Sequence, residues 1–262
     1  MEPRDLTYEH GPVEMAYTET AGPTDAGDRV YVLIHGIGMG RVVYAGVGEE
    51  LSGNGRVLAV DLPGFGDSPE PGSAATLEQT AEVIAQFIRD RVPDTAVLVG
   101  HSMGTQIVAE VAHRYPELVE ALVLIAPTVN RHERTAIRQG MRMVQDLWGE
   151  TPKVLLLGLW QYAKTSPIWF LNKLRFMLGH RIEAICPTIT TPTLVLTGED
   201  DRVCPPDWVR EVADALPDGV MELIPDRGHE AIIRSPEPVA SMILDFAQRR
   251  STGFGNATNS LA

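Results

Sequence analysis

The chain has 262 residues, of which 44% are hydrophobic, so it can form one catalytic-sized domain with an insertion, or two small domains. This apolar content is too high for a disordered chain. The net charge of −13 argues against nucleic acid as a partner, because phosphate binding needs a basic face.

The first half of the chain alternates between strand-like and helix-like segments. Residues 6–20 alternate in polarity around Gly11-Pro12 and predict an edge hairpin. Short apolar runs that end at turn residues predict buried strands at residues 30–35, 56–61, 96–99 and 119–126. Helical spacing predicts helices at residues 41–52, 77–91 and 104–115. Thr76 followed by Gln79 is the signature of a capped helix start.

The second half continues this alternation after one interruption. Residues 193–197 and 220–224 predict strands, residues 206–216 predict a helix, and a last helix begins at Pro236. Residues 130–186 contain no strand-like run and predict several helices inserted between two strands, while residues 251–262 are small and polar and predict a loose tail. Together these elements predict an α/β fold, with a mostly parallel twisted sheet covered by helices on both faces.

The N-terminus and the cysteines bear on location. Residues 1–10 contain neither the basic nor the apolar part of a secretory signal, and no stretch reaches about 18 uninterrupted apolar residues. Cys186 and Cys204 form neither a disulfide framework nor a metal-binding spacing, and they suit a reducing compartment. We therefore expect a cytoplasmic protein with no membrane partner, no metal and no cofactor.

One serine lies in a setting typical of a catalytic nucleophile. Residues 100–104 read Gly-His-Ser-Met-Gly and join a predicted strand to a predicted helix. A sharp turn of this kind strains the serine backbone and brings its neighbours so close that a Cβ would clash, which explains the two glycines. The turn also places Ser102 at a helix N-terminus, which favours negative charge. The alternative interpretation is a glycine-rich turn with a capping serine.

Four further segments complete a recognisable set, namely His35-Gly36-Ile37-Gly38, residues 61–68 (DLPGFGDS), residues 198–203 (GEDDRV) and Gly228-His229-Glu230. In this order, the chain resembles the α/β-hydrolase superfamily over roughly residues 28–250. The resemblance implies the serine-nucleophile branch, with residues 1–129 and 187–250 as the core and residues 130–186 as a helical cap. It does not distinguish one enzyme of the superfamily from another.

The resemblance also implies the partners of Ser102. His229 lies in the loop after the last strand, where the base of the family is expected, and imidazole can take a serine proton near neutral pH. Asp201, three residues after Gly198, takes the place of the orienting acid, whereas Asp200 is expected to be a solvated loop charge. The order Ser102, Asp201, His229 is the one expected on this fold. The alternative for His229 is a loop histidine that caps the last helix.

The resemblance also implies which groups bind the oxyanion, and it draws attention to aromatic residues of the predicted cap. The N–H groups of Met103 and Ile37 are the expected oxyanion donors. In the predicted cap, Trp160, Trp169 and Phe170 belong to apolar runs that either pack the cap or line the substrate pocket.

The predicted cap is basic, unlike the rest of the chain. Residues 131–185 contain nine basic and four acidic residues, a net charge of +5, so the remainder carries −18 of the total of −13. Arg131, Arg134, Arg138 and Arg142 fall at helical spacing and predict either a solvated face or a rim for an anionic or carrier-bound substrate.

The sequence therefore predicts a serine hydrolase of the esterase or thioesterase type that acts on a small or medium carboxylic ester. A cofactor-free lyase, cyclase or acyltransferase of the same fold is the alternative. A binding protein without activity is disfavoured by the complete Ser-His-Asp set, and an epoxide or haloalkane hydrolase by a serine where those enzymes use aspartate.

Overall fold

The computed structural model describes residues 2–23, 29–147 and 152–255. The strands are β1 (Arg4–His10), β2 (Val13–Thr20), β3 (Val30–Ile34), β4 (Arg56–Val60), β5 (Ala96–His101), β6 (Val119–Ile125), β7 (Thr193–Gly198) and β8 (Gly219–Ile224). The α-helices are α1 (Ala45–Ser52), α2 (Leu77–Arg91), α3 (Met103–Arg114), α4 (Ala136–Leu147), α5 (Pro152–Lys164), α6 (Pro167–Gly179), α7 (Ile182–Ile185), α8 (Pro206–Ala215), α9 (Ala231–Arg234) and α10 (Pro236–Gly255). Short 3₁₀ turns are η1 (Arg41–Tyr44), η2 (Pro116–Leu118), η3 (Arg131–Glu133) and η4 (Cys186–Thr188).

The eight strands form one sheet in the order β1-β2-β4-β3-β5-β6-β7-β8. Strand β1 pairs antiparallel with β2, and β2 pairs antiparallel with β4. All other neighbouring strands are parallel. In the centre, Gly100 of β5 lies between Ile34 of β3 and Leu124 of β6. This register brings the ends of β3, β5 and β6 to one edge of the sheet, which confirms the predicted mostly parallel α/β architecture.

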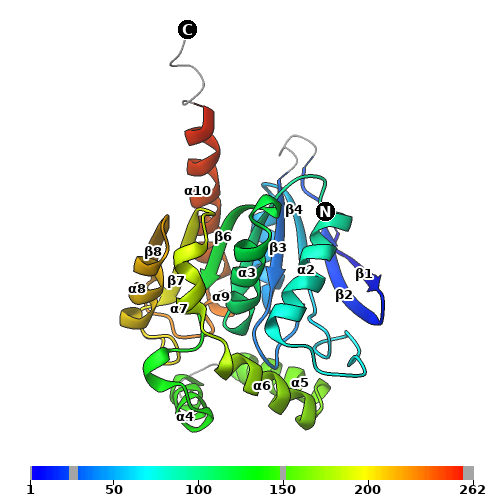
Figure 1. Cartoon of the computed structure of the whole chain (residues 1–262), viewed down its shortest axis with the longest axis vertical. Coiled ribbons are helices and arrows are strands. Elements are labelled where there is room, and N and C mark those ends of the chain that lie inside the picture. The colour runs from blue at the N-terminus through cyan, green and yellow to red at the C-terminus, as the bar shows by residue number, and fades with distance from the viewer. Residues whose placement is uncertain (1, 24–28, 148–151, 256–262) are drawn as a thin grey trace.

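Helices cover both faces of the sheet (Figure 1). Apolar residues of α2, α3 and α8 form one large core on one face, and those of α1, α9 and α10 form a second core on the other. The strands between them are buried on both sides, which is why they appear in the sequence as continuous apolar runs rather than alternating ones. Thr76 and Gln79 form the predicted capping box at the start of α2.

Two local details differ from the sequence prediction. The predicted helix at residues 41–52 begins with the 3₁₀ turn η1, and a Cβ at Gly46 would lie 2.8 Å from Cβ of Pro236, so glycine permits α1 to approach α10 closely. Residues 251–255 of the predicted tail belong to α10, which continues to Gly255. Adding a residue to an existing helix is easier than starting one, so weak formers can extend it. Residues 256–262 lie outside the described part of the chain.

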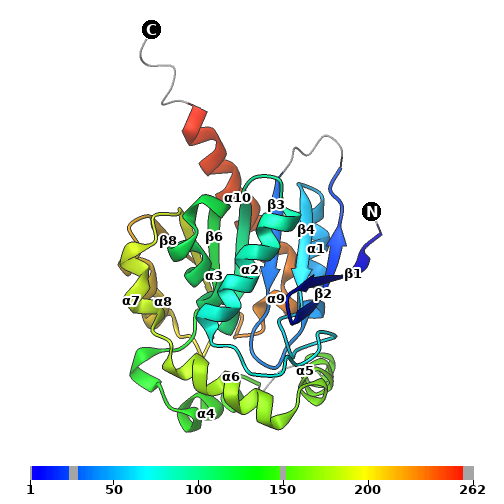
Figure 2. The same cartoon turned by 45° about the vertical axis from the view of Figure 1, so that its right-hand side comes forward.

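The segment between β6 and β7 contains α4, α5, α6 and α7, in agreement with the helices predicted there. Helices α4, α5 and α6 form a layer beyond the carboxyl ends of the parallel strands, opposite the end from which α10 projects (Figures 1 and 2). We call residues 130–186 the inserted segment. Among the described residues, none of the helices combines the length and apolar character needed to cross a bilayer.

Candidate active site

The turn between β5 and α3 has the strained geometry that its sequence predicts. Ser102 adopts φ 53° and ψ −120°, a conformation that is rare for a residue with a side chain. A Cβ at Gly100 would lie 2.6 Å from the backbone of Gly104, and a Cβ at Gly104 would overlap the carbonyl of Ile34. The two glycines are therefore required for α3 to pack directly against β3 and β5, with Ser102 held at the helix start.

The structure brings Ser102, His229 and Asp201 together, although they come from three separate loops. His229 Nε2 lies 3.1 Å from Ser102 Oγ, and His229 Nδ1 lies 3.0 Å from Asp201 Oδ2. Their exposed fractions are 6% for Ser102 and 2% for each of the other two. This buried chain of contacts is the arrangement in which an imidazole can take a proton from a hydroxyl while a carboxylate fixes its orientation.

Asp201 is held in place by the loop that carries it. Its Oδ1 accepts hydrogen bonds from the backbone N–H groups of Val203 at 2.8 Å and Cys204 at 2.7 Å. Burial alone would raise the pKa of Asp201, but the charge and hydrogen bond of His229, together with these amides, hold it below its usual value. Asp200, the alternative in sequence, is exposed and makes none of these contacts.

Asp201 has the opposite effect on His229. Burial opposes protonation of the imidazole, but the charge and hydrogen bond of Asp201 outweigh it and raise the pKa of His229 above its ordinary value. His101 lies beside this pair, with ring centroids 5.0 Å apart, and its Nε2 donates to the backbone carbonyl of His229 at 3.0 Å. Burial and the neighbouring His229 lower the pKa of His101 to about 3, so His101 is a neutral support for the loop.

Asp146 of α4 is a site residue that the sequence analysis missed. Its Oδ2 accepts a hydrogen bond from the backbone N–H of His229 at 2.9 Å, and its Oδ1 accepts one from Arg202 N–H at 3.2 Å. One carboxylate therefore joins the loops of His229 and Asp201 to the inserted segment. Burial raises the pKa of Asp146, and the charge of Asp201 adds to this effect. No pattern in the sequence indicates this contact, because Asp146 lies in a polar stripe of an ordinary-looking helix.

The predicted oxyanion donors lie on two segments next to Ser102. Met103 is the first residue of α3, where backbone N–H groups lack helical partners. Ile37 follows Gly36, and a Cβ at Gly36 would lie 3.0 Å from Ser102 Cβ, so this loop packs directly on the serine. His35 shapes the loop from beneath, because its Nδ1 donates to the Gly36 carbonyl at 2.7 Å and its Nε2 accepts from Leu62 N–H at 2.9 Å.

The three aromatic residues predicted for the substrate pocket have different environments. Trp169 is buried and packs against Gly64, whereas Trp160 is half-exposed beneath the ammonium of Lys164, which lies 3.9 Å from its ring centroid. Phe170 contacts Tyr162 with ring centroids 5.4 Å apart. The Tyr162 ring packs on Gly38 in the predicted oxyanion loop. Tyr162 is thus a second residue that the sequence analysis missed.

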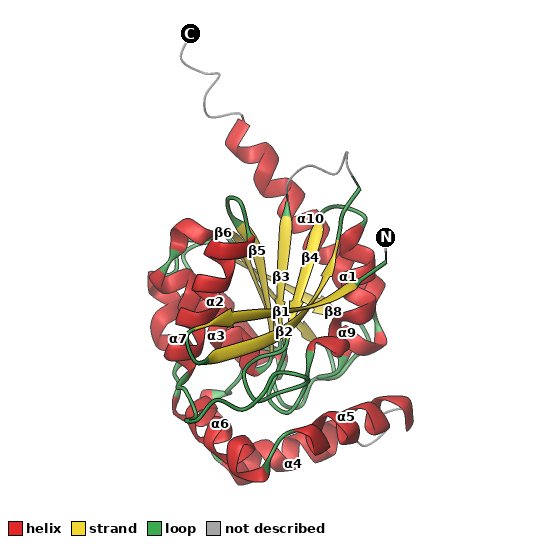
Figure 3. Ribbon diagram, turned by 90° about the vertical axis from the view of Figure 1, so that its right-hand side faces the viewer, coloured by secondary structure: helices red, strands yellow, loops and turns green. Residues whose placement is uncertain are grey.

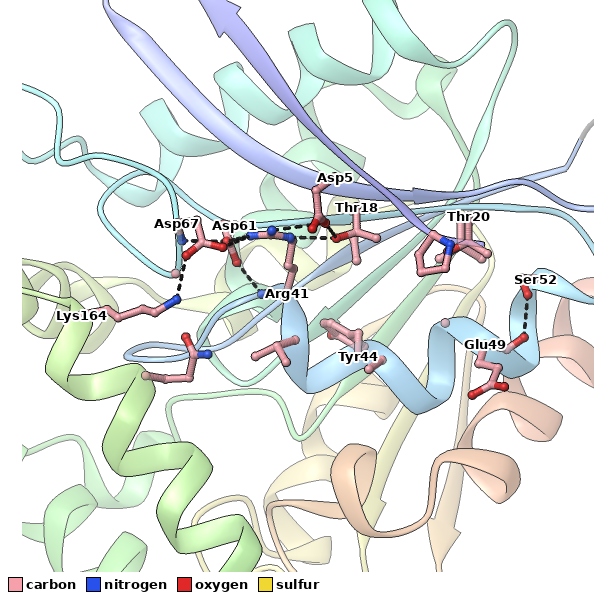
Figure 4. Close-up of a pocket in the computed structure, with 18 of the residues that line it drawn as sticks. Asp5, Thr18, Thr20, Arg41, Tyr44, Glu49, Ser52, Asp61, Asp67 and Lys164 are labelled. Atoms are coloured by element: carbon pink, nitrogen blue, oxygen red, sulfur yellow. Dashed lines mark hydrogen bonds and ion pairs between the residues drawn. The ribbon is translucent and has the colours of Figure 1, made fainter. Parts of the chain in front are cut away.

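Trp160 also lines a cavity of about 630 Å³. Figure 4 shows Arg41 in this cavity among Asp5, Asp61 and Asp67, with Lys164 next to Asp67. The residues that line the cavity do not include Ser102, Asp201 or His229. Its cationic groups are already paired with carboxylates, and the Lys164–Asp67 pair at 2.7 Å attaches α5 to the core.

Two groups of side chains among the described residues have a composition that could bind a metal ion. One is Asp201, Cys204 and His229, which overlaps the candidate site itself. The other is Glu78, Glu110 and His180. There Glu110 already accepts from His180 at 2.8 Å and from Arg114 at 2.7 Å, so these contacts join the end of α6 to α3 without an ion.

The arginine stripe of the inserted segment, made of Arg131, Arg134, Arg138 and Arg142, bonds largely to other groups of the same chain. Arg131 pairs with Glu211 at 2.8 Å, Arg134 with Glu183 at 2.9 Å and Arg142 with Glu133 at 2.6 Å. Arg138 donates to the carbonyl of His132 at 3.2 Å. Three of the four guanidinium groups therefore have carboxylate partners that an anionic substrate would have to displace.

Comparisons with known proteins identify the family. The model of the Alpha/beta hydrolase family matches residues 31–242. A 2-hydroxy-6-oxo-6-(2'-aminophenyl)hexa-2,4-dienoic acid hydrolase of Metapseudomonas resinovorans is 30% identical over 84% of this chain and 84% of that protein. A pimeloyl-[acyl-carrier protein] methyl ester esterase of Edwardsiella ictaluri is 26% identical over 86% of this chain and 96% of that protein.

Among solved structures, a thermophilic esterase from Thermogutta terrifontis has a TM-score of 0.79 at 23% identity, and the match covers 95% of this chain and 99% of that one. This likeness shows that the fold is shared. The relatives are hydrolases and esterases, and the family match spans most of the chain. The chain therefore belongs to the alpha/beta hydrolase family.

Proposed function

We propose that this protein is a serine hydrolase that cleaves a small or medium carboxylic ester or thioester through an acyl-serine intermediate. One observation carries the proposal, namely the buried chain of contacts from Ser102 Oγ through His229 to Asp201, with distances of 3.1 and 3.0 Å. Membership of a family whose relatives are esterases and hydrolases supports it.

The proposed reaction has two halves, formation of the acyl-serine and its hydrolysis, and His229 transfers a proton in each. His229 Nε2 takes the proton of Ser102 Oγ while Oγ attacks the acyl carbon, and the carbonyl oxygen becomes an oxyanion that Met103 and Ile37 N–H groups stabilise. His229 then gives its proton to the leaving alcohol or thiol, and the acyl group stays on Ser102. In the second half His229 takes a proton from water, the hydroxide attacks the ester, and Ser102 regains its proton as the acid leaves.

Two residues position the base without touching the reacting atoms. Asp146 accepts from the backbone N–H of His229, and His101 donates to its backbone carbonyl. Both contacts restrain the His229 backbone, while Asp201 restrains the ring. In this proposal the inserted segment acts as a cap, because α4 supplies Asp146 and α5 supplies Tyr162 beside the loop at Gly38.

The proposed substrate is an ester with an apolar acyl or alkyl part. Phe170 and Tyr162 provide an aromatic wall near the predicted oxyanion loop, and Trp160 and Trp169 support the same helices. One relative is named for a methyl ester and the other for a dienoic acid, so the relatives already differ in substrate. Three arginines of the arginine stripe already pair with carboxylates of the chain, and an anionic or carrier-bound substrate would have to break these pairs. We therefore favour a neutral ester.

The test combines covalent labelling with turnover. A fluorophosphonate probe should label the wild type at Ser102, and nitrophenyl esters of short acids should be hydrolysed. Ser102→Ala should lose the label and lower kcat by several orders of magnitude while the melting temperature is unchanged. Labelling without turnover of any ester would overturn hydrolysis in favour of a lyase, cyclase or acyltransferase. Undiminished turnover in Ser102→Ala would overturn the mechanism itself.

A further inference from the structure

Large apolar side chains gather in solvent on the inserted helices. Ten such side chains are well exposed among the described residues, and eight of them belong to α4, α5 and α6. The eight are Ile137, Met141, Val144, Leu156, Trp160, Tyr162, Ile168 and Leu171. Single exposed apolar residues are ordinary on any protein, but their concentration on one part of the surface marks a place where something else binds.

Helix α4 has its amphipathic character reversed. Ile137, Met141 and Val144 follow one face at i, i+4 and i+7, and their exposed fractions are 76%, 57% and 62%. The opposite stripe faces the protein and is mostly polar: Gln139 is only 6% exposed and Asp146 is bonded to the loops of the candidate site, while Met143 packs against the core. A surface helix normally buries its apolar stripe against the core, so the apolar face of α4 is suited to an apolar environment outside the chain.

Helix α6 extends the same surface. Ile168 and Leu171 are 76% and 61% exposed, and Arg175 follows them on the exposed side, whereas Trp169, Lys173 and Met177 are buried. Helices α4 and α6 are neighbours in the layer that lies beyond the strand ends (Figures 2 and 3). We call the exposed side of these two helices, with Ile137, Met141, Val144, Ile168, Leu171 and Arg175, the outer helical face.

Charge distinguishes this region from the rest of the molecule. Residues 152–179 contain no aspartate or glutamate but contain three lysines and Arg175, in a chain that has 35 acidic residues. The inserted segment carries +5 over residues 131–185, against −18 for the remainder. An anionic surface would therefore attract the inserted helices and repel the body, so it would meet the outer helical face first.

We propose that the outer helical face docks on the surface of an anionic lipid bilayer. Apolar side chains that protrude from two helices suit insertion between lipid chains, and the exposed guanidinium of Arg175 suits acidic headgroups. A second copy of the chain would instead bring two positively charged faces together. Helices of residues 2–23, 29–147 and 152–255 are too short or too polar to cross a bilayer, but binding at a bilayer surface does not require a crossing helix. The proposal does not depend on the role of Ser102.

The test is sedimentation of the full chain with large vesicles of phosphatidylcholine alone or mixed with phosphatidylglycerol. Binding should be at least about tenfold stronger to the anionic vesicles, and it should weaken as salt is added. Ile137→Gln/Met141→Gln should lower the binding at least about tenfold, because two inserted side chains lose their burial in lipid. Arg175→Gln should weaken binding to the anionic vesicles only.

The matched control is Val42→Gln/Val220→Gln, which removes the two well-exposed apolar side chains outside the inserted segment and should bind like the wild type. If Ile137→Gln/Met141→Gln lowers the melting temperature, Ile168→Gln/Leu171→Gln probes the same face from α6. Equal loss in the control pair, or equal binding to neutral and anionic vesicles, would overturn the proposal. So would a dimer in light scattering that the α4 pair abolishes, because a second copy would then cover this face.

Discussion

The strand ends and the inserted segment arrange polar and apolar residues in opposite ways. Around Ser102, apolar strands are buried on both faces, and the buried polar groups bond to one another at close range. In α4 of the inserted segment, the apolar residues Ile137, Met141 and Val144 face outward, and the inward side is mostly polar. Apolar packing therefore explains how the sheet is held together, whereas α4 is held by the packing of Met143 together with hydrogen bonds.

A few polar contacts add to the apolar packing of α6 in attaching the inserted helices to the core. Lys164 pairs with Asp67 at 2.7 Å, and Lys173 donates to the carbonyl of Ala75 at 2.8 Å. Asp146 bonds to the loop of His229, so part of the attachment runs through the candidate site itself. The contrast teaches that the core is specified by buried area, whereas the position of the inserted segment depends on directional bonds in addition to the apolar packing of residues such as Trp169 and Met177.

The largest expected effect is in the core. Asp201→Asn should lower kcat on the order of 10⁴-fold, because the ring of His229 would lose the partner that fixes its tautomer. Asp200→Asn is the matched control and should change kcat little, since Asp200 is exposed. Steady-state ester hydrolysis measures both, and the reverse pattern would show that Asp200 is the orienting acid.

A pair of glycine substitutions compares the two regions directly. Gly104→Ala should destabilise the protein by about 3 kcal/mol, because its Cβ would meet the backbone carbonyl of Ile34, which cannot move aside. Gly140→Ala in α4 should stabilise it by up to about 1 kcal/mol, because its Cβ meets nothing within 4 Å and alanine favours a helix. Denaturant unfolding gives both values. A large loss from Gly140→Ala would show that α4 is packed as tightly as the core.

Lys173 makes the stability of the protein depend on pH. Burial lowers the pKa of Lys173 from 10.5 to about 8, so between these values the unfolded chain binds a proton that the folded chain has lost. Stability should therefore be lower below pH 8 and rise with pH up to about 10.5. Relative to Lys173→Met, the wild type should gain roughly 2 to 3 kcal/mol between about pH 7 and pH 10. Parallel stability curves for the two proteins would contradict a buried, titrating lysine.

The smallest effect is expected at the contact between the two regions. Asp146→Ala should lower kcat about tenfold, because the His229 loop would lose a restraint while the Ser102–His229–Asp201 contacts stay intact. KM should change less than kcat if Asp146 only positions the base. Gln145→Ala, at the exposed neighbouring position, is the control. Loss of folding in Asp146→Ala, rather than loss of kcat, would make this residue structural.

Local patterns were sufficient for most of the fold. Each buried strand appears as a short apolar run with a turn residue after it, and the Thr76–Gln79 cap marks the start of α2, because these signals depend on residues close in sequence. The strand-to-helix turn at Gly100–Gly104 could be predicted for the same reason, because both of its glycines lie within a single short connection. The family resemblance then placed His229 and Asp201, which the structure brings to Ser102.

Tertiary structure alone decided which distant groups meet. Asp146 and Tyr162 reach the loops of the site only after the inserted helices lie over the strand ends, and His101 at the end of β5 meets the His229 loop only in the folded sheet, so no spacing in the chain encodes those contacts. The sequence did not indicate carboxylate partners for the arginine stripe, because the partner glutamates lie in other turns and helices. Likewise, the sequence predicted helices within residues 130–186, but only the structure shows that Ile137 and Met141 of α4 face solvent while Asp146 faces the protein.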